Sequence, residues 1–237
     1  MKKQIELGMA ILILFASAFL GRQGAKLANA NHAERSHQAY KVVIDAGHGG
    51  VDGGKVSADG VLEKDINLAV AKKLQRLLEA ADVEVVLTRE TDAGLYEESD
   101  KNKKVADLQK RCALIKKEAP DCTVSIHQNS FSSPQVRGAQ VFYYSQSKEG
   151  EQLAESIQQS LILRVGEEYQ RQKKANDSYY LLKRTTSPTV IVECGFLSCP
   201  QEAVLLTDEV YQERLAWAIH IGVMEFLNKM TINVISE

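Results

Sequence analysis

Residues 42–54, VVIDAGHGGVDGG, join an apolar run to a loop that contains five glycines and one histidine, His48. The β-branched run predicts a buried strand, and the glycines predict a tight bend directly after it. Three interpretations of this junction compete: a phosphate-binding loop, a turn with an incidental histidine, and a metal ligand that needs open space for a substrate.

Composition limits the class of protein. The chain has 237 residues, of which 44% are hydrophobic and 25% are charged. These proportions predict one globular domain with a full core rather than a disordered chain. The 29 basic and 31 acidic residues give a net charge of −2, so charge gives no reason to expect nucleic acid as a partner.

The first thirty residues differ in composition from the rest. Two lysines precede the apolar stretch 7–20, and a polar segment ends at Ala30, which is the order of a secretory signal. The apolar stretch would span only about 21 Å as a helix, against roughly 30 Å for a bilayer core, which favours a cleaved leader. We expect a signal peptide or N-terminal membrane anchor at residues 1–30, a linker at 31–39 and an exported domain at 40–237.

After the linker, strand-like and helix-like segments alternate. Strands are predicted at Lys41–Ile44, Val83–Leu87, Thr123–Ile126, Ala139–Tyr144 and Thr189–Val192, with a short sixth at Tyr180–Leu182. Apolar residues at helical spacing predict helices around residues 66–77, 153–161 and 215–226, and a further helix is expected at 105–118, ending before Pro120. This alternation predicts an α/β single domain with a mostly parallel, roughly six-stranded sheet covered by helices on both faces.

Ionisable residues follow three of the predicted strands. His48 lies just beyond the first strand, His127 follows Ile126, and Glu193 follows Val192. A lone histidine is usually structural, but ligands of open α/β sheets bind beyond the carboxyl ends of the strands, where these side chains would meet. A carboxylate buried at Glu193 would be costly without a partner. The three positions therefore predict a shared site.

Several kinds of site are excluded by the residues around the glycines. Asp52 stands where a dinucleotide-binding loop needs its third glycine, and Val56 follows Lys55 where a phosphate loop needs serine or threonine. A G-x-S-x-G nucleophile motif is also lacking from the sequence.

The cysteines give no metal or redox motif. Cys112, Cys122, Cys194 and Cys199 match no C-x-x-C spacing, and we expect buried thiols, with Cys194–Cys199 as the local candidate for a disulfide. A nucleophilic Cys194 is disfavoured because the adjacent Glu193 would raise its pKa.

A metal site remains. Two imidazoles and one carboxylate are a standard ligand set for catalytic zinc, with a fourth position left for water. The carboxylate could be Glu193 or Glu63, which precedes a helix in EKDINLAV, residues 63–70. The spacing in the sequence does not show which glutamate has which role. We expect one of them to bind the metal and the other to remain free to act as a base.

Five segments together resemble a known family. They are IDAGHGG (44–50), EKDINLAV (63–70), SIHQNS (125–130), VIVECGFLS (190–198) and EAVLL (202–206). The chain is similar to the zinc-dependent N-acetylmuramoyl-L-alanine amidases of the amidase-3 family from Val42 to the last helix. The resemblance implies that residues 40–237 are a zinc amidase catalytic domain in which His48, Glu63 and His127 bind Zn²⁺ and Glu193 is the catalytic base.

Within that family, the compact length and the segment RGAQVFYY (137–144) are most similar to the germination-specific spore-cortex amidases. This resemblance implies peptidoglycan as the partner, hydrolysis of the amide between N-acetylmuramic acid and L-alanine, and processing of the product to muramic δ-lactam. It implies a location in the cell wall or the spore cortex. A vegetative cell-wall autolysin and a non-catalytic peptidoglycan-binding protein are the alternatives, and the need for a protein activator is left open by the sequence.

Three residues depart from the family pattern, namely Gln128, Cys194 and Cys199. The chain lacks the long insertion that carries an inhibitory helix in larger members of the family, so we expect a site open to an extended glycan strand. The glycines around His48 are expected to let the backbone bend and to leave room for a bulky substrate.

Overall fold

The computed structural model describes residues 40–166 and 171–235. The predicted leader or anchor at residues 1–30 and the linker at 31–39 lie outside the described residues. Within the described ranges, no helix combines the length and the apolar character needed to cross a bilayer.

Six strands form one mixed sheet in the order β2-β1-β3-β6-β4-β5. The strands are β1 (Lys41–Ala46), β2 (Glu84–Leu87), β3 (Cys122–Asn129), β4 (Gln140–Tyr143), β5 (Lys174–Ala175) and β6 (Thr189–Phe196). β2, β1, β3 and β6 are parallel to one another, β4 is antiparallel to β6, and β5 is parallel to β4. The predicted mostly parallel sheet is confirmed.

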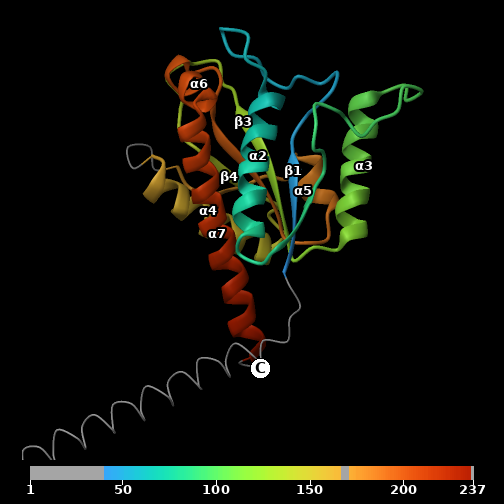
Figure 1. Cartoon of the computed structure of the whole chain (residues 1–237), viewed down its shortest axis with the longest axis vertical. Helices are drawn as coiled ribbons and strands as arrows, with labels where there is room; N and C mark the ends of the chain where they lie inside the picture. The colour runs from blue at the N-terminus through green and yellow to red at the C-terminus, as the bar shows by residue number, and fades with distance from the viewer. Residues whose placement is uncertain (1–39, 167–170, 236–237) are drawn as a thin grey trace, which may run out of the picture. The chain divides into compact units, whose positions relative to one another are not determined.

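Helices cover both faces of this sheet (Figure 1). One face packs against α2 (Glu63–Glu79), α4 (Lys148–Arg164), α6 (Pro200–Thr207) and α7 (Glu209–Ile235), and the other packs against α3 (Lys103–Glu118) and α5 (Tyr180–Arg184). Side chains alternate along β1, so that Val42 and Ile44 belong to the larger core under α2 and α7, whereas Val43 packs with Ile115 and Leu181 on the opposite face.

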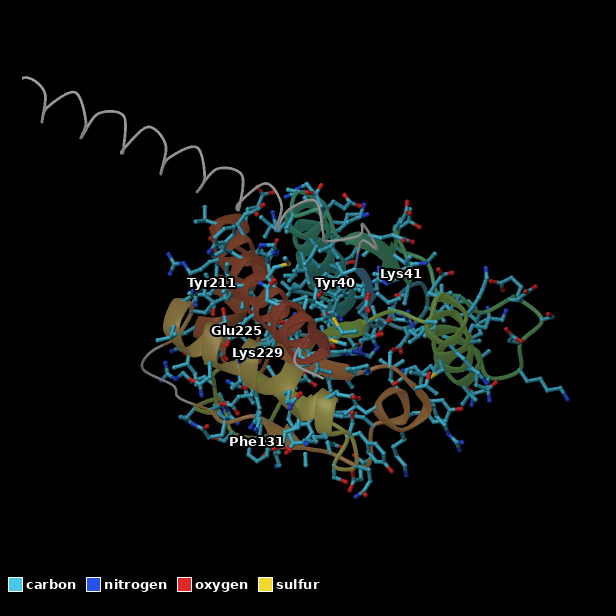
Figure 2. The ribbon with its side chains drawn as sticks, turned by 90° about the horizontal axis from the view of Figure 1, so that it is seen from below. Tyr40, Lys41, Phe131, Tyr211, Glu225 and Lys229 are labelled. Atoms are coloured by element: carbon cyan, nitrogen blue, oxygen red, sulfur yellow. The ribbon has the colours of Figure 1, made fainter. Side chains whose placement is uncertain are left out.

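Contacts at the beginning of the described chain tie it to the last helix. The hydroxyl of Tyr40 donates a hydrogen bond of 3.0 Å to the carbonyl of Leu227 in α7, and Figure 2 shows Tyr40 beside this helix. Lys41 follows as the first residue of β1, so the sheet is held against α7 at this end.

One predicted strand is wrong. Residues Tyr180–Leu182 form the start of the short helix α5 instead. Asn176 accepts hydrogen bonds from the backbone N–H groups of Ser178 and Tyr179, which turns the chain before α5. In this helical turn, Leu181 and Leu182 pack into two different apolar clusters. The strand that completes the six-stranded sheet is β5, at Lys174–Ala175.

Other differences concern boundaries and cysteines. β3 and β6 extend beyond Ile126 and Val192, so His127 and Glu193 lie within the strands rather than after them. Helix α6 was not predicted, because its eight residues are too few to show a clear apolar period. All four cysteines are free and buried, so the buried thiols are confirmed and the candidate disulfide Cys194–Cys199 is wrong.

Candidate metal centre

The candidate site lies at the carboxyl ends of β1, β3 and β6. In β3 and β6, Ile126 and Val192 face the larger core, so the next residues, His127 and Glu193, point to the side of the sheet that carries α3 and α5. These two residues are direct partners in the β3–β6 ladder, and the register shifts between His127 and Asn129. Such irregularities are frequent beside active sites, where they re-aim side chains.

Three side chains converge there. The carboxylate oxygen Oε1 of Glu63 lies 3.2 Å from Nε2 of His48 and 2.9 Å from Nδ1 of His127. One donor atom from each residue lies within 4.8 Å of the other two, and the two imidazole rings are 5.0 Å apart in an edge-to-face arrangement. Two nitrogen donors and one oxygen donor at this spacing could hold a divalent metal ion such as zinc.

Glu63 is fixed by several donors. It is the first residue of α2, where a negative charge is favoured by the helix dipole. Its oxygens accept hydrogen bonds from the backbone N–H groups of Lys55 and Gln128, at 2.8 and 3.0 Å. Burial alone would raise the pKa of Glu63, but hydrogen bonds from His127 and His48 outweigh this effect and lower the pKa well below its usual range. Glu63 is therefore an ionised carboxylate in a buried position.

His48 has an unusual backbone conformation and an oriented ring. Its φ is 62°, in the left-handed region that costs roughly 1–2 kcal/mol for a residue with a Cβ. Its Nδ1 lies 2.9 Å from Oδ2 of Asp52, and the other oxygen of Asp52 is 2.8 Å from Nζ of Lys104. A carboxylate on one ring nitrogen directs the other nitrogen, here Nε2, toward the metal position.

Two glycines allow the ligand side chains to approach one another. A Cβ at Gly47 would overlap the ring of His127. A Cβ at Gly54, where φ is +71°, would lie 2.6 Å from Oε2 of Glu63. The structure thus gives the glycines a different use from the expected one, because the space that they leave is filled by His127 and Glu63 rather than kept for a substrate.

Glu193 lies beside this group without belonging to it. It is 6% exposed, and its Oε1 accepts a hydrogen bond of 3.1 Å from the hydroxyl of Tyr179. Its other oxygen, Oε2, has no hydrogen-bond partner among the described residues. Burial raises the pKa of Glu193 above its ordinary value, although the nearby His127 opposes the effect.

A cavity of about 320 Å³ opens onto these groups. It is lined by His48, His127 and Glu193, and by Tyr179 from the segment before α5.

The thiol of Cys194 lies outside the cavity lining in the larger core, where burial, and then the charge of Glu193, raise its pKa to about 12. Cys194 is thus unsuited to act as a nucleophile, as predicted.

The sequence predicts the four central residues, but it does not predict that Asp52 and Tyr179 contact two of them. Asp52 was considered only as a residue that breaks a dinucleotide motif, although its position four residues after His48 in one loop could have indicated a ring partner. Tyr179 carries no such signal, because the segment that brings it to Glu193 was expected to be a strand.

Comparisons with known proteins identify relatives of this chain. The family Amidase_3, described as N-acetylmuramoyl-L-alanine amidase, matches residues 42–225. The germination-specific N-acetylmuramoyl-L-alanine amidase of Bacillus subtilis is 37% identical over 191 residues, covering 79% of this chain and 80% of that protein. The amidase LytC of the same organism is 31% identical over 199 residues, covering 83% of this chain and 37% of LytC.

Solved structures show the same similarity. The CwlD amidase of Clostridioides difficile, in complex with the GerS lipoprotein, has a TM-score of 0.78 and 41% sequence identity, and the match covers 80% of this chain and 98% of CwlD. A second amidase, from Clostridium difficile 630, has a TM-score of 0.71 and 32% identity, covering 80% of this chain and 97% of that one.

Proposed function

Because the chain belongs to the N-acetylmuramoyl-L-alanine amidase family and is a peptidoglycan amidase, we propose that it works with a zinc ion held by His48, Glu63 and His127. In this proposal Glu193 is the catalytic base, and the bond cleaved joins N-acetylmuramic acid to L-alanine. One observation carries the proposal: a buried carboxylate oxygen, Oε2 of Glu193, lacks a partner within the described chain directly beside three convergent donors.

The donor set fits zinc. Two imidazole nitrogens and one carboxylate oxygen lie within 4.8 Å of one another, and catalytic zinc sites use three protein ligands of these kinds. The resting charge also fits, because the low pKa of Glu63 keeps an anion at the centre of the group. When bound, the ion supplies Lewis acidity, which polarises an amide carbonyl and makes water more acidic.

Glu193 moves the proton in this mechanism. Its Oε2 accepts a proton from the attacking water and delivers it to the departing amine nitrogen of L-alanine. Burial raises the pKa of Glu193, which favours uptake of the proton that it later returns to the amine. Tyr179 holds Oε1, so the free oxygen is the one that remains available to the substrate.

For the substrate, we propose spore-cortex peptidoglycan, with muramic δ-lactam formed downstream and a role in germination. The support is similarity to two proteins, the germination-specific amidase of B. subtilis and the CwlD amidase of C. difficile. Vegetative peptidoglycan is the second candidate substrate, because the chain is also similar to the N-acetylmuramoyl-L-alanine amidase LytC. We further propose that residues 1–30 direct the domain across the membrane to the wall, as a cleaved leader or as an anchor.

Digestion of the two kinds of peptidoglycan tests the proposal. Cortex and vegetative peptidoglycan are incubated separately with the zinc-loaded chain, and the products are identified by mass spectrometry. We expect a new free amine on L-alanine, and faster release from cortex. Cleavage at another bond would overturn the proposed reaction, and faster release from the vegetative wall would favour the second substrate. Chelation of zinc should abolish both activities.

A further inference from the structure

Two buried arginines contact the loop that carries His48, and the mechanism above uses neither of them. Arg89 follows β2 and is 6% exposed, and Arg111 lies in α3 and is 2% exposed. A buried guanidinium is costly unless its charge is paired and its N–H groups are satisfied. The partners of these two side chains therefore indicate what they do.

Arg111 binds the loop at two carbonyls. Its Nη1 donates to the carbonyl of Ala46 at 2.8 Å, and its Nη2 donates to the carbonyl of His48 itself at 2.6 Å. Its charge is balanced by Asp45 at 2.7 Å and by Asp107 at 2.6 Å. Asp45 is in turn bound by the hydroxyl groups of Thr88 and Ser125.

Arg89 binds the carbonyls next to these. Its Nε donates to Ala46 at 2.9 Å, and its Nη2 donates to Gly47 at 3.1 Å and to Lys64 at 2.7 Å. Lys64 directly follows Glu63 at the start of α2. Arg89 therefore joins the loop of one candidate ligand to the helix turn of another.

Together the two guanidinium groups occupy three consecutive carbonyls, those of Ala46, Gly47 and His48. The third of these residues has the left-handed φ of 62°, a conformation that persists only where the surroundings hold it. A planar guanidinium presents several donors in a rigid fork, so it can fix more than one carbonyl at once, whereas an ammonium group acts as a point charge.

We propose that Arg111 and Arg89 are positioning residues that hold the loop of residues 46–48 in the bend that aims the imidazole of His48 at the metal. This inference rests on the proposed metal site. It assigns the two buried arginines to the affinity and geometry of that site, although Arg111 also lines the cavity beside it.

Arginine-to-lysine variants test this role, because lysine keeps a positive charge and loses the fork of donors. For Arg111→Lys and for Arg89→Lys we expect zinc affinity to fall about 10–100-fold, the range typical for partners of metal ligands. Affinity is measured on the full chain by competition with a chromophoric chelator. Thermal unfolding of the metal-free chain is measured in parallel.

Arg171→Lys is the matched control. Arg171 also donates to a backbone carbonyl, that of Arg137 at 2.8 Å, and stacks on the ring of Phe196. This variant should bind zinc as the unmodified chain does. His48→Ala sets the lower limit of affinity, and the two test variants should lie between these references.

The outcomes separate the two proposals. Unchanged zinc affinity in both test variants, with or without a lower melting temperature, would overturn the positioning role alone. Failure of both variants to fold in the presence of zinc would also overturn it, because the guanidinium groups would then serve the fold as a whole. Failure of the unmodified chain to bind zinc would overturn the proposed function, and this inference with it.

Discussion

Replacing Glu193 by glutamine tests the identity of the catalytic base. Glu193→Gln keeps the shape of the side chain and an acceptor for the hydroxyl of Tyr179, 3.1 Å from Oε1, but removes the group that accepts a proton. A positioned general base contributes about 10²–10⁴-fold to a rate. We therefore expect kcat to fall at least about 100-fold, which is about 3 kcal/mol of barrier.

Stability and metal content should change little in this variant. Oε2 of Glu193 is already unpaired within the described residues, so the amide that replaces it creates no additional unpaired position. We expect the free energy of unfolding to change by less than about 1 kcal/mol. Zinc should remain at one ion per chain, because the three converging donors come from other residues. Activity is measured by the appearance of free L-alanine amines in digested peptidoglycan.

Glu202→Gln is the control for burial of a carboxylate. Glu202 is also buried, and it accepts hydrogen bonds from the backbone N–H groups of Gly138 and Phe196, at 2.9 and 2.8 Å. Its substitution should lower stability and leave turnover unchanged. Normal turnover by Glu193→Gln would refute the assignment of the base, and loss of zinc from that variant would move Glu193 into the ligand set.

Three further predictions use other groups of the site. His127→Ala should weaken zinc binding more than about 100-fold, beyond the effect of losing an indirect partner, and a folded variant with a full zinc content would contradict this. Tyr179→Phe removes the donor to Glu193 and should lower kcat about 10-fold with KM and zinc content unchanged, measured by steady-state kinetics. Burial alone would raise the pKa of Asp45, but the adjacent guanidinium lowers it from 3.8 to about 2. The ionised, paired form of Asp45 stabilises the fold above about pH 4 by about 2 kcal/mol, and this contribution is lost as the pH falls through about 2. Asp45→Asn should accordingly flatten the acid limb of urea unfolding, and an unchanged acid limb would count against the ion pair.

The sheet and its functional edge could be predicted because both depend on local patterns. Apolar runs such as Val42 to Ile44 indicate strands, and a polar residue at the end of each run falls at the edge where ligands bind. That reasoning selected His48, His127 and Glu193. The choice of Glu63 over Glu193 as a ligand needed the family resemblance, because linear spacing does not show which carboxylate reaches the imidazoles.

Contacts between distant segments could not be predicted in the same way. Arg111 is separated by more than sixty residues from the carbonyls that it binds, and an arginine in an amphipathic helix reads as a solvated side chain. The position of Tyr179 depends on the path of the short segment around it. This segment is too short for its apolar pattern to distinguish a helix from a strand. Buried polar networks of this kind become visible only once the packing of the helices is known.

The pairing of His127 with Glu193 in one parallel ladder has a consequence for the geometry of the site. Neighbouring strands lie about 4.8 Å apart, so the backbone hydrogen bonds between β3 and β6 set the distance between the side chains of His127 and Glu193. Because the backbone sets this distance, replacement of side chains elsewhere on the surface leaves it unchanged. The relative position of the two side chains is thus a property of the sheet itself and does not depend on the surface loops.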